Sequence, residues 1–198
     1  MFDSTKQQPT ELCTLAMKYG SDKCPQIGHQ YTPFYYELLK PHQNTFKKIL
    51  EFGVCNRRIF TAIPNYQMGA SLRMWRDFFP NAQVYGADIA AGSIFKDERL
   101  ETFRCDEDKE DEIKALIEKI GGDIDFMVDD CSHHIHQQMF LFKTLMPLLK
   151  KDVIYVCEDC GRTRQMMKTY PEYNSYSPKL LPNSRPLAHD GIVVFTNK

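Results

Sequence analysis

Between Phe46 and Cys157, short apolar runs alternate with amphipathic stretches, and this alternation constrains the fold more than any other feature of the chain. Strands are expected over residues 47–52, 83–87, 102–105, 126–128 and 153–157, with a last one over 191–196. Helices are expected between them, over 71–79, 109–120 and 137–149. Strands that alternate with helices imply right-handed crossovers and a mostly parallel sheet covered on both faces. The sequence therefore predicts the α/β class.

The clearest helix of the chain is the one over residues 109–120. Ile113, Leu116, Ile117 and Ile120 follow one another at helical spacing, and Gly121 and Gly122 end the pattern. Two further helices are expected before the alternating region, over 12–19 and 33–39. We expect residues 1–45 to form a helical and loop segment that caps the active site, and residues 46–198 to form the core of a single domain. The polar residues 161–190 show no regular pattern and are expected to form a lid or binding loop.

Composition excludes several classes of protein. The 198 residues are 42% hydrophobic and 26% charged, with a formal net charge of -1, so the strong positive charge of a nucleic-acid-binding protein is missing. No apolar run approaches the roughly 20 residues that span a bilayer, and the polar N-terminus lacks the apolar core of a signal peptide. An odd number of cysteines, seven, favours buried free thiols over a disulfide framework. A cytoplasmic protein without a membrane span is expected.

Residues 124–136, IDFMVDDCSHHIH, place two acids and three histidines directly after a buried apolar run. In an open parallel sheet, ligands bind beyond the carboxyl ends of the strands, so these side chains are placed to do chemistry. The simpler interpretation is a solvated turn in which Asp130 or Ser132 caps the following helix. One capping residue would suffice for that purpose, whereas this turn carries six polar or ionisable side chains.

Acids stand at the end of nearly every expected strand. They are Glu51, Asp88, Asp106, Asp129 with Asp130, and Glu158 with Asp159. On one edge of a sheet these carboxylates would repel one another unless a cation or hydrogen-bond donors compensated them. The edge is therefore expected to hold a cation, a polyhydroxyl ligand, or both.

The first two strands match the plan of a nucleoside site. Gly53 follows the first strand, where the backbone must approach a ligand closely, and Asp88 ends the second, where a carboxylate would take the ribose hydroxyls. No GxGxxG motif is present, which argues against NAD and for a nucleoside without a pyrophosphate.

The CEDC motif, Cys157 to Cys160, has the spacing of a redox pair or of half a zinc site. There is no second CxxC, so a zinc site would need Cys131 and the neighbouring histidines to complete it. Zinc stays open as a minority alternative to a site made of oxygen ligands.

Taken together and in order, several motifs resemble the macrocin and mycinamicin sugar O-methyltransferases, which are class I S-adenosylmethionine enzymes. The motifs are YGSDK, HQYTPFYYELL, EFGV, GASLRMWRDFFPNAQVYGADI, DFMVDDCSH and YVCEDC, and the likeness runs from about Leu15 to Cys160. It implies a Rossmann-like methyltransferase fold, here with a shortened C-terminal part. It also implies S-adenosylmethionine as cofactor, a divalent cation, and methylation of a deoxysugar such as rhamnose in a glycan or glycoside.

The resemblance also assigns roles to residues. Glu51 and Gly53 would shape the pocket for the methionine part of the cofactor, Asp88 would hold the ribose and Asp106 would lie near the adenine, with Ser71 and Asp129 as weaker assignments to the same pocket. Asp130, Glu158 and Asp159 match the family's metal ligands, and His133 matches its proposed general base. Oxygen ligands favour a hard cation, so Mg²⁺ is the first choice, with Mn²⁺ or Ca²⁺ as alternatives. No family role falls to His134 or His136, which are expected to face solvent or cap a helix.

Other functions remain open at the level of sequence. A catechol-type O-methyltransferase would use the same cofactor fold, and a metal-dependent hydrolase would use the acid and histidine cluster but leave Glu51, Gly53 and Asp88 unexplained. A non-catalytic binding module is disfavoured because His133 and the three metal acids are all present. The expected partner is a small-molecule or glycan sugar acceptor, and the chain is expected to be either a homo-oligomer or one domain of a larger glycan-assembly enzyme.

Overall fold

The computed structural model of the protein describes residues 8–54, 63, 65–180 and 191–198. These residues form a mixed sheet of eight strands in the order β3-β4-β2-β1-β5-β6-β8-β7. The strands are β1 (Lys48–Phe52), β2 (Gln83–Asp88), β3 (Lys96–Asp97), β4 (Leu100–Arg104), β5 (Phe126–Asp129), β6 (Ile154–Cys157), β7 (Asn174–Tyr176) and β8 (Val193–Thr196). Strands β4, β2, β1, β5 and β6 pair in parallel, whereas β3, β8 and β7 join in antiparallel fashion.

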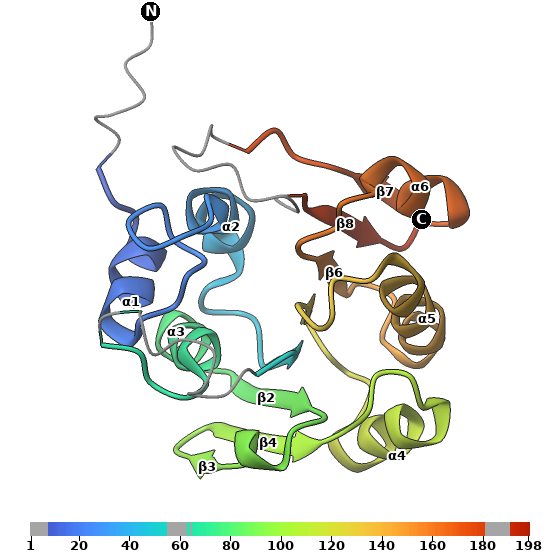
Figure 1. Cartoon of the computed structure of the whole chain (residues 1–198), viewed down its shortest axis with the longest axis horizontal. Helices are drawn as coiled ribbons and strands as arrows, with labels where there is room; N and C mark the ends of the chain where they lie inside the picture. Colours follow the sequence, from blue (N-terminus) through green and yellow to red (C-terminus); the bar gives the residue numbers. More distant parts are fainter. Residues whose placement is uncertain (1–7, 55–62, 64, 181–190) are drawn as a thin grey trace, which may run out of the picture.

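Helices cover both faces of this sheet, as Figure 1 shows. Helices α1 (Glu11–Tyr19), α2 (Tyr31–Leu39) and α3 (Ala70–Phe78) lie on one side. Helices α4 (Glu110–Ile120), α5 (Ile135–Leu145) and α6 (Thr163–Thr169) lie on the other. Short 3-10 turns follow α2 (Lys40–His42), β2 (Ala91–Ser93) and α5 (Met146–Leu148). The predicted α/β class with a mostly parallel sheet is confirmed.

Local sequence explains where the helices begin and end. The Thr10 hydroxyl accepts a hydrogen bond from the Cys13 amide at 3.2 Å and caps α1, and Gly20 ends that helix with a φ of 75°. Helix α4 buries the predicted stripe of Ile113, Leu116, Ile117 and Ile120. Helix α5 stops at Leu145, earlier than predicted, because Pro147 removes a backbone donor and only a 3-10 turn continues.

Each face of the sheet has its own apolar core. On the side of α1–α3, Trp75 packs edge-to-face on Tyr35 and Phe126, with ring centroids 5.1 and 5.4 Å apart. On the side of α4–α6, Phe142 packs on Phe195 at 4.2 Å. Because apolar side chains cover both faces, the polar groups at the carboxyl ends of the strands are left to form one edge.

Two expectations about the chain's periphery need correction. Residues 161–190 are not wholly irregular, because they contain α6 and β7, and β7 extends the sheet by pairing with β8. Strand β3 was not predicted, since two residues are too few to show a period. Residues 181–190 of the expected loop lie outside the described residues.

The described cysteines agree with the expected free thiols. Five of them are buried and one, Cys131, is half-buried, and none of these six forms a disulfide. Within the described part of the chain, none of the helices combines the length and the apolar character that crossing a membrane would require.

Candidate functional site

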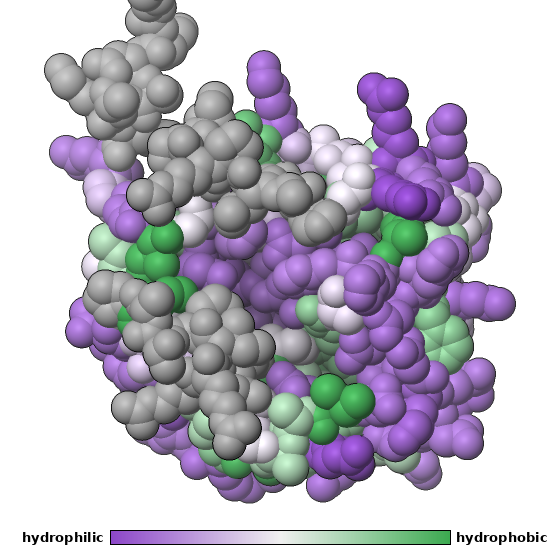
Figure 2. Space-filling model, in the orientation of Figure 1, coloured by the Kyte–Doolittle hydropathy of each residue, from purple (hydrophilic) through white to green (hydrophobic). Residues whose placement is uncertain are grey.

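A cavity of about 460 Å³ opens at the carboxyl ends of the parallel strands. Figure 2 shows a hydrophilic hollow in the middle of this face of the molecule. Residues from the N-terminal segment form one wall, and residues after β1, β2, β4, β5 and β6 form the rest. The lining includes Gly53, Ser71, Asp88, Asp130, His133, Glu158 and Asp159, all of which the sequence singled out.

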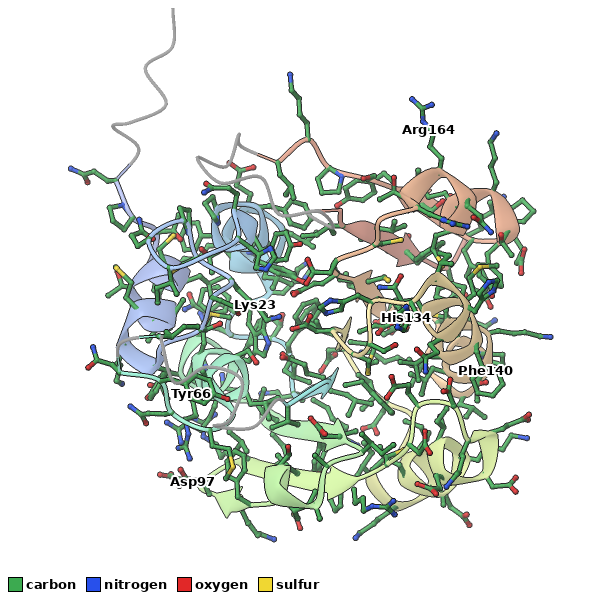
Figure 3. All side chains as sticks on the ribbon, viewed as in Figure 1. Lys23, Tyr66, Asp97, His134, Phe140 and Arg164 are labelled. Atoms are coloured by element: carbon green, nitrogen blue, oxygen red, sulfur yellow. The ribbon has the colours of Figure 1, made fainter. Side chains whose placement is uncertain are left out.

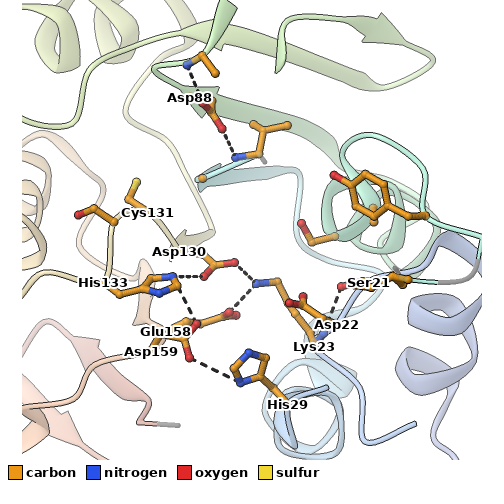
Figure 4. A pocket seen from close by; sticks show the side chains of 18 of the residues that line it. Ser21, Asp22, Lys23, His29, Asp88, Asp130, Cys131, His133, Glu158 and Asp159 are labelled. Carbon is orange, nitrogen blue, oxygen red and sulfur yellow. Dashed lines mark hydrogen bonds and ion pairs between the residues drawn. The ribbon is translucent and has the colours of Figure 1, made fainter. Parts of the chain in front are cut away.

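The centre of the site is a buried ammonium group surrounded by acids. The Lys23 side chain is only 2% exposed, and its Nζ lies 2.5 Å from Glu158 Oε2 and 2.6 Å from Asp130 Oδ2. Glu51 Oε1 is 3.9 Å away. Figure 3 labels Lys23 in the N-terminal segment, and Figure 4 shows its side chain reaching towards Asp130 and Glu158. The compensating cation that the acidic edge requires is thus supplied in part by the chain itself.

Two tyrosines of α2 donate hydrogen bonds to the same acids. The Tyr35 hydroxyl donates to Glu158 Oε1 at 2.5 Å, and the Tyr31 hydroxyl donates to Asp159 Oδ1 at 2.6 Å. Burial raises the pKa of Glu158 well above its ordinary value, even though Lys23 favours its ionised form. For Asp130, burial acts in the same direction, but Lys23 and His133 outweigh it and lower the pKa. Asp130 is therefore the stronger acid of this pair.

Asp130, His133 and Asp159 form a compact group of potential metal ligands. One ligand atom from each lies within 4.8 Å of the others. His133 Nε2 is 3.2 Å from Asp130 Oδ1 and 3.4 Å from Asp159 Oδ2. The hydrogen bond to Asp130 raises the pKa of His133 above its ordinary value. The two carboxylates suit a hard divalent cation, so they fit the metal that the resemblance implies, and the His133 imidazole lies beside them.

The backbone at two of these residues is strained in the way that functional sites often are. His133 and Asp159 adopt φ values of 60° and 48°, in the left-handed region that favours glycine. Their side chains are nevertheless the ones that meet at the cavity. The turns after β5 and β6 therefore hold a conformation that glycine would adopt more easily, while presenting an imidazole and a carboxylate.

Asp88 lies at the other end of the cavity, after β2. Its Oδ2 accepts a hydrogen bond from the Val54 amide at 2.9 Å, and its Oδ1 accepts one from the Ala90 amide at 2.7 Å. Ile89 beside it is 51% exposed, which is unusual for a large apolar side chain, and it also lines the cavity. A carboxylate next to an exposed apolar side chain suits a nucleoside, which has hydroxyls on the sugar and a flat apolar base.

Glu51 does not line the cavity, but it lies directly behind two residues that do. It is fully buried in β1, where it accepts hydrogen bonds from Ser71 Oγ at 2.5 Å and from Trp75 Nε1. Burial raises the pKa of Glu51 to about 7, despite the opposing effect of Lys23. Glu51 therefore positions Ser71 and Lys23, which form part of the cavity wall.

Gly53 lines the cavity and is required by the neighbouring strand as well. Its φ is 93°, and a Cβ placed there would lie 2.0 Å from the carbonyl oxygen of Asp130. The ends of β1 and β5 thus come so close that no side chain fits between them. This contact explains the glycine without any reference to a ligand.

Besides Glu51, two predicted cofactor residues lie away from the cavity lining. Asp129 is fully buried, accepts a hydrogen bond from the Tyr155 hydroxyl at 3.1 Å, and has its second oxygen without a hydrogen-bond partner among the described residues. Asp106 accepts the Asp108 amide at 3.1 Å in the turn before α4. Its neighbour Glu107 lines the cavity instead. Their assignments to the cofactor pocket stay predictions.

Sequence reasoning missed the cationic and aromatic residues of the N-terminal segment. Lys23 and His29 both line the cavity, and His29 Nδ1 lies 3.6 Å from Asp159 Oδ1. The YGSDK and HQYT motifs contained these residues, but neither lies in a pattern with a chemical meaning of its own. A signal was present in the count of acids, because a crowded acidic edge requires a cation.

The simpler interpretation of residues 124–136 is wrong. His134, not Asp130 or Ser132, occupies the N-cap position of α5, and it makes no side-chain capping bond. Ser132 instead contacts Gln137 at 2.5 Å. His134 and His136 are exposed, as expected. Figure 3 places His134 at the start of α5.

No thiol enters the group of potential metal ligands found among the described residues. Cys157 and Cys160 are buried and hydrogen-bonded to each other, next to Glu158 and Asp159. The zinc alternative therefore has no support in this part of the chain.

The fold is that of a Rossmann-like methyltransferase. It is defined by the sheet order, the crossovers and a cavity that has Asp88, the acid expected to bind a ribose, at one end. The mycinamicin-pathway methyltransferase MycE, in a complex with Mg, S-adenosylhomocysteine (SAH) and mycinamycin VI, superposes with a TM-score of 0.75 at 21% identity, covering 96% of this chain and 56% of that one. An O-methyltransferase from Bacillus cereus in complex with SAH gives a TM-score of 0.60 at 11% identity, covering 99% of this chain and 94% of that one. At these identities the likeness shows the fold alone.

Sequence comparison identifies the homologues as sugar O-methyltransferases. A rhamnosyl tetracenomycin-C 2'-O-methyltransferase from Streptomyces olivaceus is 34% identical over 148 residues, which are 75% of this chain and 37% of that protein. Mycinamicin VI 2''-O-methyltransferase from Micromonospora griseorubida is 30% identical over 151 residues, 75% of this chain and 36% of that protein. No protein-family model matches the chain. The matched part thus spans little more than a third of these relatives.

Proposed function

We propose that the chain catalyses methyl transfer from S-adenosylmethionine to a hydroxyl of a sugar, with a divalent cation and with His133 as general base. The observation that carries this proposal is the meeting of Asp130, His133 and Asp159 within 4.8 Å in a cavity that also contains Asp88. Relatives that methylate rhamnosyl and other sugar groups support a deoxysugar acceptor in a glycan or glycoside. A catechol-type enzyme would share the fold but not the sugar acceptors of the relatives, and a hydrolase would leave Asp88 unexplained.

The cofactor would lie between Gly53, Ser71 and Asp88. Asp88 is already oriented by the amides of Val54 and Ala90, so its carboxylate is held in place to accept hydrogen bonds from ribose hydroxyls. Glu51 supports Ser71 from behind. Asp106 and Asp129 complete the proposed set as residues that shape the turns after β4 and β5.

The acceptor hydroxyl would lie beside His133. Asp130, Asp159 and Glu158 are the proposed ligands of Mg²⁺, which would acidify and orient this hydroxyl. The neutral imidazole of His133 would accept the hydroxyl proton, and S-adenosylmethionine would supply the methyl group. Asp130 holds the imidazole through the contact at 3.2 Å. Alignment of the oxygen with the methyl group would contribute more to the rate than the base does, because correct positioning can lower the barrier by up to about 7–11 kcal/mol.

Within the expected N-terminal segment 1–45, the described residues 8–45 would cover the acceptor side of the cavity and exclude water from it. Asp22 and His29 lie in this wall, where an acid and an imidazole suit the hydroxyls of a sugar. The identity of the acceptor is a proposal. The assembly of the chain with itself or with further domains is a proposal as well. The matched region spans 36–37% of the length of these relatives.

The experiment that tests this proposal is a methyl-transfer assay with isotope-labelled S-adenosylmethionine. Rhamnosides, other deoxysugar glycosides and catechols are offered in parallel, with Mg²⁺ and with a chelator. Label transfer to a sugar that stops with the chelator is the expected result. Asp130→Ala should abolish it, whereas Asp152→Ala, which changes an 81% exposed carboxylate, should not. Transfer to catechols alone, or none to any acceptor, would overturn the proposal.

A further inference from the structure

Lys23 is held in the site by its own backbone as well as by its charge. Its carbonyl oxygen accepts hydrogen bonds from the amides of Tyr31 and Thr32 at 3.1 and 3.0 Å, which ties the loop to the start of α2. The side chain then runs inward and is almost fully buried. Such a lysine occupies a fixed position and does not sample the solvent.

The Lys23 ammonium group joins two strands of the sheet. It donates to Asp130, which follows β5, and to Glu158, which follows β6, and it lies within 4 Å of Glu51 in β1. A buried cation among three acids is the compensation that keeps such acids from destabilising the fold. The proposed metal ligands Asp130, Glu158 and Asp159 follow two of these strands, β5 and β6.

All four carboxylate oxygens of Asp130 and Glu158 already contact a side chain of the protein. Asp130 has Oδ2 on Lys23 and Oδ1 on His133, and Glu158 has Oε2 on Lys23 and Oε1 on Tyr35. Both oxygens of Glu158 are therefore engaged, and Glu158 lies outside the compact group of Asp130, His133 and Asp159. A divalent cation that used Glu158 would have to displace one of its donors, and one that used Asp130 would lie close to the Lys23 charge.

We propose that Lys23 is the resident cation of this carboxylate cluster, and that a divalent cation competes with its ammonium group for Asp130 and Glu158. This inference rests on the metal site of the proposed function. In the metal-free protein Lys23 stabilises the cluster, and metal binding requires the lysine to give up at least one of its two short contacts. Lys23 thereby sets how tightly the metal is held, and it is a positioning residue for the metal.

The test is calorimetric titration of Mn²⁺ into the wild-type protein and Lys23→Met. Loss of the competing charge should tighten Mn²⁺ binding by at least about tenfold, since two like charges a few ångströms apart repel strongly at a protein site. The melting temperature without metal should fall, because three acids lose their cation, and Mn²⁺ should restore it. Lys18→Met, which removes a lysine that is 55% exposed and paired with Asp77, serves as the matched control and should change neither quantity. Unchanged or weaker Mn²⁺ binding by Lys23→Met would overturn the inference.

A second variant, Lys23→Gln, keeps a hydrogen-bond donor while removing the charge, and it should tighten Mn²⁺ binding as well. If either variant is unfolded without metal, Mn²⁺ should restore its circular-dichroism spectrum, and a chain that stays unfolded at saturating Mn²⁺ contradicts the inference. SAH binding to the wild-type protein is measured alongside. If the wild-type protein binds SAH but the Lys23 variants bind Mn²⁺ no more tightly, only the competition between Lys23 and the metal is refuted. If the wild-type protein binds no SAH, the proposed function is refuted.

Discussion

Replacement of Gly53 by alanine tests how closely the end of β1 approaches the backbone of Asp130 in the turn after β5. The new Cβ would lie 2.0 Å from the Asp130 carbonyl oxygen and 2.5 Å from its carbonyl carbon. A carbon and an oxygen in contact lie about 3.3 Å or more apart, so the backbone at Asp130 has to move by more than about 1 Å. Neither atom belongs to a flexible side chain that could turn away.

Two costs add for this substitution. The φ of 93° is unfavourable for alanine by roughly 1–2 kcal/mol, and forcing a methyl group against the backbone adds roughly 1–3 kcal/mol or more. We therefore expect Gly53→Ala to lose roughly 2–5 kcal/mol of stability. For a domain of this size that corresponds to a melting temperature lower by roughly 4–20 °C.

The assay is thermal unfolding followed by circular dichroism, with Gly92→Ala as the matched control. A Cβ at Gly92 would meet nothing within 4 Å, so this variant should stay within about 1 kcal/mol of the wild-type protein. The backbone shift at Asp130 should also weaken Mn²⁺ binding in Gly53→Ala and not in Gly92→Ala. A Gly53→Ala protein as stable as the control would refute the packing argument.

Three further outcomes are expected. In a methyl-transfer assay Asp130→Ala should abolish turnover, while His133→Ala should retain a measurable rate. Loss of a general base lowers the rate about 10²–10⁴-fold, and loss of positioning lowers it further. Equal losses of rate in the two variants would refute this ranking. The rate of the wild-type enzyme should rise with pH through a midpoint above 6.5, because the hydrogen bond to Asp130 raises the pKa of His133 and the neutral form is the base; a midpoint below that value would contradict it. Burial raises the pKa of Asp129 to about 7 from 3.8, so its contribution to stability falls as pH rises between these values. Denaturant titrations should accordingly find Asp129→Asn more stable relative to the wild-type protein at about pH 8 than at about pH 5, and a constant difference would count against that pKa.

Most of the fold could be predicted because its signals are local. The stripe of Ile113, Leu116, Ile117 and Ile120 predicted α4, and the helix found ends one residue before Gly121. The apolar run at Phe126 to Val128 predicted a central strand, and β5 lies between β1 and β6. Elements without a period of their own were missed, because α6 and β7 owe their form to contacts with β8 and with the core around Phe142.

The site could be predicted only in part, for a similar reason. Asp130, His133 and Asp159 follow strands, and parallel strands bring their carboxyl ends to one edge, so their meeting follows from topology. Lys23 comes from a loop more than a hundred residues away from Asp130 in the chain, and no local pattern says that it turns inward. Charge balance required a cation at the site, but it did not indicate which residue supplies it.

The most direct test of the account is calorimetric titration of SAH into the wild-type protein and Asp88→Ala. The account predicts binding to the wild-type protein that weakens by about 10–100-fold in Asp88→Ala, because hydrogen bonds to a charged group contribute about 1.5–3 kcal/mol. Asp123→Ala, which alters a 72% exposed carboxylate, should bind SAH as the wild-type protein does. A wild-type protein that binds no SAH, or that binds it equally well without the Asp88 carboxylate, would contradict the account.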